Sequence, residues 1–490
     1  MSNIMLVSWI STTFAPDVTT TVYKPYPYYN LEAVQWSLLF GVCFLLGIGM
    51  GANDVADAFG TSVGTGTITL TQAFILATVV EMMGSVASGF TGDGKALEII
   101  DTNSYAGDPE ELVLGQIAML IGSSTWLMIA TFYSMPVSPI HSILGATMGF
   151  SFVLRGFHAI FWDRVLIIGL VWVFSPFISA IFTIFIFFLL DVCILRAKNP
   201  VKTGLFLLPG IYAIVVFTNV FLFLQDGSRV LHIDDIPFLY TLAVSIIIAV
   251  ISGFIALFVI APIMKKRLKK PLPNQEELPR IASSLSYSIV QKTNWLRKAV
   301  KWAFPPMRND DQKAVRLFSF LQILTACFAG FAHGANDVTN CVGPMRDLVR
   351  MYNENYQDDN TNMNISIYMG LLATLAVLLG IWTLGVRVIY TVGSKFSKMN
   401  PATGFSVEFG AAICALATNA FNIPQSMTHC LVGSIFGLGL VRSGPILDWP
   451  TVKYVFLSWV LTIPVSGLIS AGAMLLLRTF LKAVDLEGFV

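Results

Sequence analysis

The chain has 490 residues, of which 55% are hydrophobic and only 12% are charged, and its mean hydropathy is +0.72. A soluble domain carries about a quarter charged residues, so this composition excludes an ordinary water-soluble globular protein. The net charge of +1 gives no reason to expect a nucleic-acid partner. The composition therefore predicts an integral membrane protein with membrane lipid around it.

Apolar segments follow one another along the chain. The segment from Val171 to Leu190 contains no charged residue, and about 20 apolar residues cross a bilayer core as a helix. Because the alternation of barrel strands is not seen, we expect an all-α polytopic protein, with about ten full spans plus two hairpins, or about twelve spans. The segments lie near 33–52, 70–90, 112–134, 140–155, 164–194, 204–224, 238–263, 315–333, 366–386, 405–423, 429–442 and 453–478.

Basic residues predict the orientation of these segments. A cluster follows the seventh segment, and the positive-inside rule places it in the cytoplasm; it comprises Lys265, Lys266, Arg267, Lys269 and Lys270. Counting spans in both directions places Arg196 and Lys395 inside as well, and the acidic loop around Asp234 outside. We therefore expect a multi-pass protein of the plasma membrane with both termini extracellular and a cytoplasmic linker.

Two sequence motifs occur twice, in the same order and at nearly the same offset. Gly51-Ala-Asn-Asp-Val55 recurs as Gly334-Ala-Asn-Asp-Val338, and Pro136-Val-Ser-Pro-Ile-His141 is echoed by Pro424-Gln-Ser-Met-Thr-His429. The orientation argument starts the first copy outside and the second inside. The halves are therefore expected to be inverted-topology repeats, which in secondary transporters meet at a substrate site near the midplane.

The repeats predict how the chain is divided. We expect an extracytoplasmic tail (1–30), a first inverted repeat (31–196), intervening transmembrane helices (197–264), a proline-rich linker (265–313), a second repeat (314–480) and a C-terminal tail (481–490). The segment pairs 112–155 and 405–442 are either two full spans apiece or re-entrant hairpins. Hairpins are favoured because the Pro-x-Ser-x-x-His tips would then reach the middle of the membrane, where irregular backbone must be buried or line a cavity.

Acidic and amide side chains occur inside the apolar segments. A carboxylate deep in the membrane costs roughly 2.5–3.5 kcal/mol on insertion scales and needs a partner. We expect each Gly-Ala-Asn-Asp-Val motif to mark a broken helix, whose free carbonyls and polar side chains suit a hard cation such as sodium. These side chains are Asn53, Asp54, Asn336 and Asp337. The alternative is a polar turn that ends a span.

Hydroxyl groups mark the two expected tips. Ser138, Ser426 and Thr428 would lie beside free backbone N–H groups and the positive ends of half-helices, which together suit an anion. The alternative is that the serines only cap helices. Because the tips contain no arginine or lysine, a co-bound cation would have to offset the anion's charge, which fits cation-coupled uptake.

Several further residues are candidates for cation coupling. Glu81 and Glu408 lie within apolar segments, where each could bind a cation, carry a proton or pair with a helix break. Possible additional members of the site are Asp57, Asn340, Gln116, His141 and His429. No nucleotide-binding loop, nucleophile elbow or Cys/His metal cluster is present, so we expect neither an enzyme nor a cofactor other than sodium as co-substrate.

These motifs resemble the inorganic phosphate transporter (PiT) family, and its sodium-dependent eukaryotic branch in particular. The matching segments are Gly51-Ala-Asn-Asp-Val-Ala-Asp-Ala-Phe-Gly-Thr61, Glu81-Met-Met-Gly-Ser85 and Gly404-Phe-Ser-Val-Glu408. The resemblance implies a homodimeric sodium–phosphate symporter. It places Asp54, Asp337 and the tip hydroxyls at the phosphate and ion site, and Glu81 and Glu408 in sodium coupling.

The chain departs from the family pattern at three positions. Asp57 stands where the family usually has Asn, Ile140 stands where the first tip usually has Thr, and Met427 replaces a Thr in the second tip. Ile140 has no hydrogen to donate to a phosphate oxygen. Two alternatives therefore stay open: a proton-coupled symporter of phosphate or another oxyanion, and a transport-dead phosphate sensor or receptor with the same fold.

Overall fold

The computed structural model describes residues 32–87, 99–105, 109–226, 236–269, 310–352, 363–397, 399–420, 425–443 and 447–487. The regular structure of this part is helical, apart from an isolated antiparallel bridge between Ile100 and Ile160. The predicted tail 1–30 and most of the linker 265–313 lie outside the described residues.

The first half and the intervening segment form ten α-helical or π-helical elements and two short 3₁₀ turns among the described residues. They are α2 (Glu32–Gly64), α3 (Leu70–Ala87), η2 (Thr102–Tyr105), α4 (Pro109–Phe132), α5 (Pro139–Arg155), η3 (Phe157–Ala159), α6 (Trp162–Leu190), η4 (Asp191–Leu195), α7 (Pro200–Asp226), α8 (Phe238–Ile255), η5 (Ala256–Ile260) and α9 (Ala261–Arg267). The π-helical segments η4 and η5 continue α6 and α8 without a break.

The second half is also helical in the described residues. It comprises α11 (Gln312–Arg316), α12 (Ser319–Tyr352), α13 (Met363–Tyr390), η6 (Thr391–Lys395), α14 (Pro401–Ala420), α15 (Met427–Ser443) and α16 (Trp449–Glu487). The last of these helices continues beyond residue 480, into the stretch expected to be a tail.

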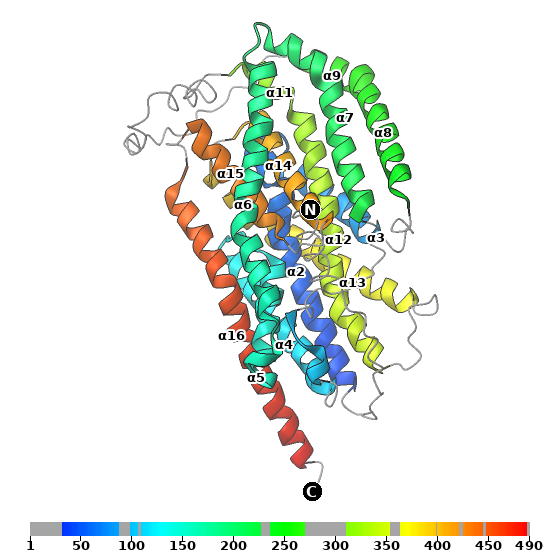
Figure 1. Cartoon of the computed structure of the whole chain (residues 1–490), viewed down its shortest axis with the longest axis vertical. Helices are drawn as coiled ribbons and strands as arrows, with labels where there is room; N and C mark the ends of the chain where they lie inside the picture. The colour runs from blue at the N-terminus through cyan, green and yellow to red at the C-terminus, as the bar shows by residue number, and fades with distance from the viewer. Residues whose placement is uncertain are drawn as a thin grey trace, which may run out of the picture.

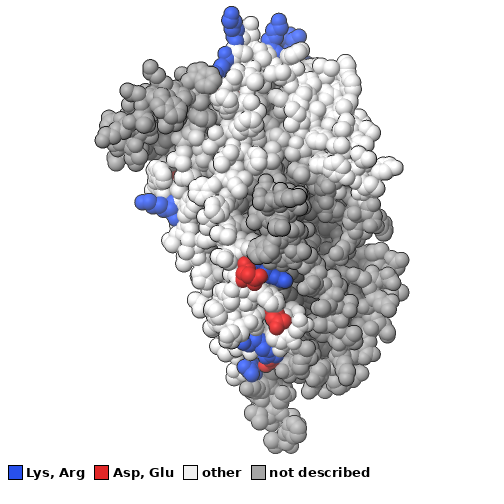
Figure 2. Space-filling model, viewed as in Figure 1, with Lys and Arg blue, Asp and Glu red and all other residues white. Residues whose placement is uncertain are grey.

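Nine helices among the described residues are long and apolar enough to cross a membrane, which is fewer than the ten full spans expected. Helices α5 and α15 each have 17 residues, about 25 Å of helix, against a hydrocarbon core of about 30 Å. Helix α14 has 20 residues but includes Glu408 and several hydroxyl side chains. Figure 2 agrees with a membrane protein: one group of Lys and Arg lies at the upper end, a mixed group of Lys, Arg, Asp and Glu lies in the lower part, and most of the described surface elsewhere is uncharged.

The expected helix breaks at the Gly-Ala-Asn-Asp-Val motifs are wrong. Helix α2 runs unbroken through Gly51–Val55, and α12 runs unbroken through Gly334–Val338. The motif glycines serve close packing between helices here, and Asn53 bonds to a neighbouring segment rather than to its own backbone. Near the expected tips, irregular backbone lies between α4 and α5, at residues 133–138, and at residues 425–426 just before α15.

Helices α2, α12 and α13 run through the middle of the molecule (Figure 1). The pair α4–α5 lies in its lower half in this view and the pair α14–α15 in its upper half. Helix α2 packs along α13 and α12 packs along α3, while α5 packs on α16 and α15 packs on α6. Each helix pair is therefore held by a long helix from the other half of the chain.

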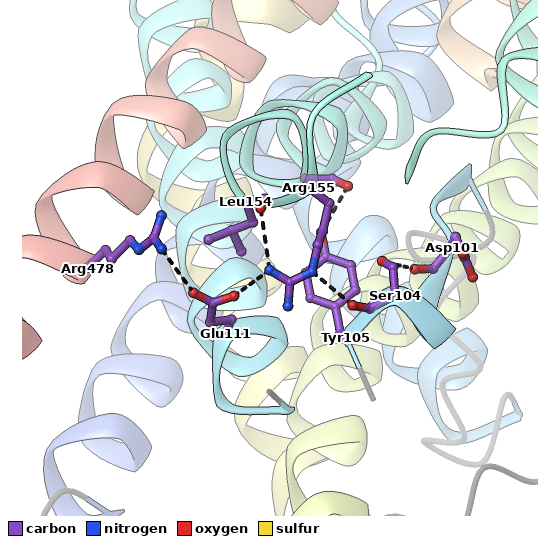
Figure 3. A network of polar contacts seen from close by, with 8 residues as sticks. Asp101, Ser104, Tyr105, Glu111, Leu154, Arg155 and Arg478 are labelled. Atoms are coloured by element: carbon purple, nitrogen blue, oxygen red, sulfur yellow. Dashed lines mark hydrogen bonds and ion pairs between the residues drawn. The ribbon is translucent and has the colours of Figure 1, made fainter. Parts of the chain in front are cut away.

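A polar network joins the outer ends of α4 and α5 (Figure 3). Arg155 at the end of α5 forms an ion pair of 2.5 Å with Glu111 at the start of α4, and Arg478 of α16 lies 3.6 Å from the same carboxylate. Arg155 also donates to the carbonyl of Ser104 at 2.9 Å and lies over the ring of Tyr105. Helices α4 and α5 are therefore antiparallel, with residues 133–138 as their tip.

Candidate functional site

Helix α2 contacts the tip between α4 and α5 through Asn53. The amide nitrogen of Asn53 donates to the carbonyl of Met135 at 3.0 Å and to the hydroxyl of Thr131 at 3.3 Å. Its amide oxygen accepts from the N–H of Val137 at 3.0 Å. The Asn53 side chain is fully buried, so these bonds hold the first tip against α2.

The second tip contacts the same face of α2. The Thr428 hydroxyl donates to Oδ2 of Asp57 at 2.5 Å, and both residues are buried. Residues four apart lie on one face of a helix, so Asn53 and Asp57 hold the two tips to a single turn of α2. The tips also meet each other, since the rings of His141 and His429 are 4.9 Å apart.

Each tip serine caps the helix that follows it. Ser138 accepts from the N–H of His141 at 3.4 Å, and Ser426 accepts from the N–H of His429 at 3.3 Å. A capping hydroxyl accepts through a lone pair and keeps its own hydrogen to donate. Both serines therefore cap helices, and capping leaves both hydroxyls chemically able to bind an anion beside two helix N-termini.

A buried cluster of acidic groups lies between α2 and α12. Ligand atoms of Asp54, His333 and Asp337 all lie within 4.8 Å of one another, and His333 Nδ1 is 3.6 Å from Oδ2 of Asp54. Oδ1 of Asp54, Oδ2 of Asp337 and Nε2 of His333 are buried and have no hydrogen-bond partner among the described residues. The structure therefore brings the carboxyls of the two repeated motifs together.

Glu81 of α3 joins this cluster because α3 and α12 approach each other very closely. A Cβ atom on Gly334 would lie 2.6 Å from the Cα of Glu81, so the second motif requires glycine at this position. The charged neighbours of Glu81 are Asp337 and Asp54. Both Glu81 carboxyl oxygens are buried and have no hydrogen-bond partner in the described part of the chain.

The charge of this cluster is not balanced by protein groups. Three carboxyls are buried together, and His333 is the basic side chain that the described structure places against them. Several buried negative charges without a partner are far too costly to persist. Cations or protons could offset this charge, and the unpartnered oxygens are the kind of ligand that a hard cation prefers.

Glu408 belongs to a different set of contacts. Its Oε1 atom accepts from the hydroxyls of Thr61 and Ser62, the latter at 3.0 Å, and from Gln322 at 3.5 Å. Its Oε2 atom accepts from Thr325 at 2.6 Å. Both carboxyl oxygens of Glu408 thus accept hydrogen bonds, and these bonds connect α14 with the end of α2 and with the start of α12. The carboxyl oxygens of Glu81, in contrast, have no hydrogen-bond partner among the described residues.

The remaining candidates lie in varied surroundings. Asn336 is exposed, Asn340 is half-buried on the same helix, and Gln116 is buried within α4. Ile140 is half-buried in the first tip.

The two tip histidines lie on the side of the tips that faces α16, because the ring of His429 is 4.0 Å from that of Trp459 in α16. Thr428 faces α2 instead.

Two functional candidates were missed from the sequence. His333 lies four residues before Asp337, and this spacing on one helix face was the available signal. In the first copy Met50 precedes the motif, so the repeat itself did not point to a histidine. Gln322 also had no local signal, because it is brought to Glu408 by the packing of α12 on α14.

Comparisons with known proteins identify the family of this chain. Residues 50–470 match the phosphate transporter family. The chain is 26% identical to sodium-dependent phosphate transporter 1 of Rattus norvegicus, over 97% of this chain and 100% of the relative. It is 27% identical to sodium-dependent phosphate transporter 2 of Xenopus tropicalis, over 86% and 94%.

A solved structure described as the sodium-dependent phosphate transporter is also similar. It superposes with a TM-score of 0.70 at 27% sequence identity, over 91% of this chain and 99% of that one. The matched family and these relatives are transporters and not enzymes. Because the family match includes both Gly-Ala-Asn-Asp-Val motifs, both tips and the carboxyl cluster, this chain is a multi-pass membrane protein that belongs to the phosphate transporter family.

Proposed function

We propose that this protein is a sodium-coupled symporter of inorganic phosphate, which binds phosphate and sodium where its two halves meet. The observation that carries the proposal is the buried cluster of Asp54, Asp337 and Glu81, with unpartnered oxygens, beside two capped helix N-termini. The names of the similar proteins, which are sodium-dependent phosphate transporters, support the same conclusion.

Sodium is proposed as the cation because the unpartnered ligand atoms are mainly carboxylate oxygens. Asp54, Asp337 and Glu81 would supply them, since helices α2 and α12 are unbroken and offer no free carbonyls at the motifs. Hard cations prefer oxygen ligands of this kind. Bound sodium would offset the negative charge of the cluster and so reduce its repulsion of an anion.

Phosphate is proposed to bind between this cluster and the tips. Ser138, Ser426 and Thr428 would donate hydroxyl hydrogens, and the first-turn N–H groups of α5 and α15 would add the positive ends of two helix dipoles. Asp57 would have to release Thr428, or share it, when phosphate arrives. The tip hydroxyls and the sodium ions together would then replace the arginine or lysine that the tips lack.

Alternating access is proposed to use two inverted repeats with re-entrant hairpins. Support comes from the contacts between helices, if α2, α3, α5 and α6 of the first half correspond to α12, α13, α15 and α16 of the second. The contact of α2 with α13 then corresponds to that of α12 with α3, and the contact of α5 with α16 corresponds to that of α15 with α6. The first tip also reaches Asn53, near the middle of the apolar span 40–64 of α2. A homodimer in the plasma membrane with extracellular termini stays a prediction.

A second candidate is proton coupling, which one specific contact favours. His333 Nδ1 lies 3.6 Å from a carboxylate oxygen of Asp54, inside the cluster. Imidazole and carboxyl groups side by side can accept protons in place of a metal cation. In this candidate a proton gradient, and not a sodium gradient, drives phosphate uptake.

Radiolabelled phosphate uptake into vesicles, with sodium and pH gradients imposed separately, distinguishes the two. Uptake that follows the sodium gradient at equal pH supports the proposal, and uptake that follows only the pH gradient overturns it in favour of proton coupling. Phosphate binding without uptake under either gradient would indicate a sensor. Asp337→Asn should abolish sodium-driven uptake, because it removes one carboxylate of the cluster.

The matched control is Asp163→Asn, the same change at an exposed position at the start of α6. This variant should transport normally, and both variants should reach the membrane in similar amounts. Normal sodium-driven uptake by Asp337→Asn would remove the second motif's carboxylate from the mechanism.

A further inference from the structure

A cavity of about 310 Å³ lies beside the second tip, between α3, α7, α12 and α14. Its walls are almost entirely apolar and include Val80, Val220, Phe223, Phe331 and Met427. The rings of Phe223 and Phe331 meet edge to face, with centroids 5.1 Å apart. The volume falls within the range of about 300–1,000 Å³ that small-molecule pockets occupy.

The cavity opens toward the surface that faces the bilayer. Met83 on its rim is 57% exposed, and Ile214 on the outer face of α7 is 60% exposed. Both belong to helices that are candidate membrane spans, so the medium outside them is hydrocarbon. An apolar cavity stays free of water, and the hydrocarbon of the surrounding bilayer is continuous with its opening.

The polar groups of the cavity do not suit a polar ligand. Asn219 is buried in the wall, and its amide nitrogen donates to the carbonyl of Val215 in its own helix at 2.8 Å. No charged side chain lines the described walls. We propose that this cavity binds an acyl chain of a bilayer lipid, which enters between α3 and α7.

The bound chain would act on the second tip. Met427 forms part of the cavity wall and lies between Ser426 and Thr428. A chain in the cavity packs against Met427 and restricts movement of the tip away from α2. This effect on transport rests on the proposed function, whereas the binding of the chain does not.

Photocrosslinking tests the binding. The purified protein is reconstituted in vesicles of a phosphatidylcholine with a diazirine near the end of one acyl chain, irradiated, and digested for mass spectrometry. We expect adducts on the cavity residues of α7 and α12, including Val220 and Phe331. Adducts confined to outward-facing residues such as Ile214 would overturn the proposal, and this measurement on the unchanged protein needs no variant to fold.

A pair of variants on α7 sharpens the test. Val220→Trp fills the cavity and should lose the adducts on Phe331, whereas Ile214→Trp places the same bulk on the outer face and should keep them. Persistence of the Phe331 adducts in Val220→Trp would contradict entry through this cavity.

Phosphate uptake is then measured on the same two variants. Altered uptake by Val220→Trp alone supports control of the second tip. If Val220→Trp loses the adducts but takes up phosphate normally, acyl-chain binding is supported and its effect on transport is overturned. Absence of uptake by the unchanged protein would count against the proposed function and not against acyl-chain binding in the cavity.

Discussion

Thr428 and Asp57 make the contact that joins the second tip to α2. A hydrogen bond to a charged group contributes about 1.5–3 kcal/mol, and about 1.4 kcal/mol corresponds to a ten-fold change in an equilibrium. Thr428→Val removes the hydroxyl that donates to Oδ2 of Asp57. The Oδ1 atom of Asp57 has no hydrogen-bond partner among the described residues, so the variant leaves the buried carboxyl without a hydrogen bond there. We expect phosphate uptake at low phosphate to fall by about ten-fold or more.

Two further substitutions separate the hydroxyl from the shape of the side chain. Thr428→Ser keeps the donor and should retain most of the uptake. Thr418→Val is the matched control on α14, because the Thr418 hydroxyl bonds only to carbonyls of its own helix in the described structure. Uptake by Thr428→Val equal to that of Thr418→Val would show that the contact with Asp57 does not matter for transport.

Single residues were predictable from the sequence where a polar group interrupted an apolar segment. Asp54, Asp337 and Glu81 were found in this way, and they lie together. The partners of those groups were less predictable. Asn53 was expected to bind a cation, yet its amide makes three hydrogen bonds around the first tip. These partners lie about eighty residues away along the chain, and a local sequence pattern does not predict such distant partners.

At the scale of elements, each helix pair lies on its supporting helix through small residues. Gly149 of α5 faces Gly467 of α16, and a Cβ atom on Gly149 would lie 2.7 Å from the carbonyl carbon of Gly467. Gly433 of α15 faces Pro176 of α6 in the same way. Small residues let membrane helices approach closely and pack without a hydrophobic driving force.

Gly149→Ala should therefore destabilise the protein, because overpacking of a close contact costs about 1–3 kcal/mol. Gly169→Ala in α6 is the matched change at a glycine with open space around it, and there the gain in helix stability is about 0.5–1 kcal/mol. Thermal unfolding of the purified variants in detergent should show shifts of opposite sign. A midpoint of Gly149→Ala at or above that of the unchanged protein would contradict the close α5–α16 contact.

The helices themselves were largely predictable from length and hydropathy, and their continuity was not. Each of the twelve expected apolar segments overlaps a helix of the described structure. The polar Gly-Ala-Asn-Asp-Val motif looked like a break because glycine and Asn-Asp pairs disfavour helix interiors. In the fold, α2 and α12 continue through it, because packing against α13 and α3 outweighs local propensity.

At the scale of the whole molecule, charge is distributed unequally between the two ends. The exposed residues Lys265, Lys266, Arg267 and Lys269 lie at the end of α9, whereas the network of Arg155, Glu111 and Arg478 lies toward the other end (Figures 1 and 3). Burial raises the pKa of the Tyr105 phenol in that network, so it stays neutral and donates to Ser151. Because positive charge is retained in the cytoplasm, we expect α9 to be cytoplasmic and the network extracellular.

Cysteine labelling in cells measures this orientation directly. The background is Cys193→Ser, because the other cysteines are buried or half-buried. Asn103→Cys, at an exposed site near the network, should react with a membrane-impermeant maleimide in intact cells, and Lys266→Cys should react only after permeabilisation. Helices α6, α7 and α8 separate the two sites, whether or not α4 and α5 each span the membrane. Labelling of both sites from one side of the membrane would therefore contradict the fold. Reversed labelling would contradict the orientation alone.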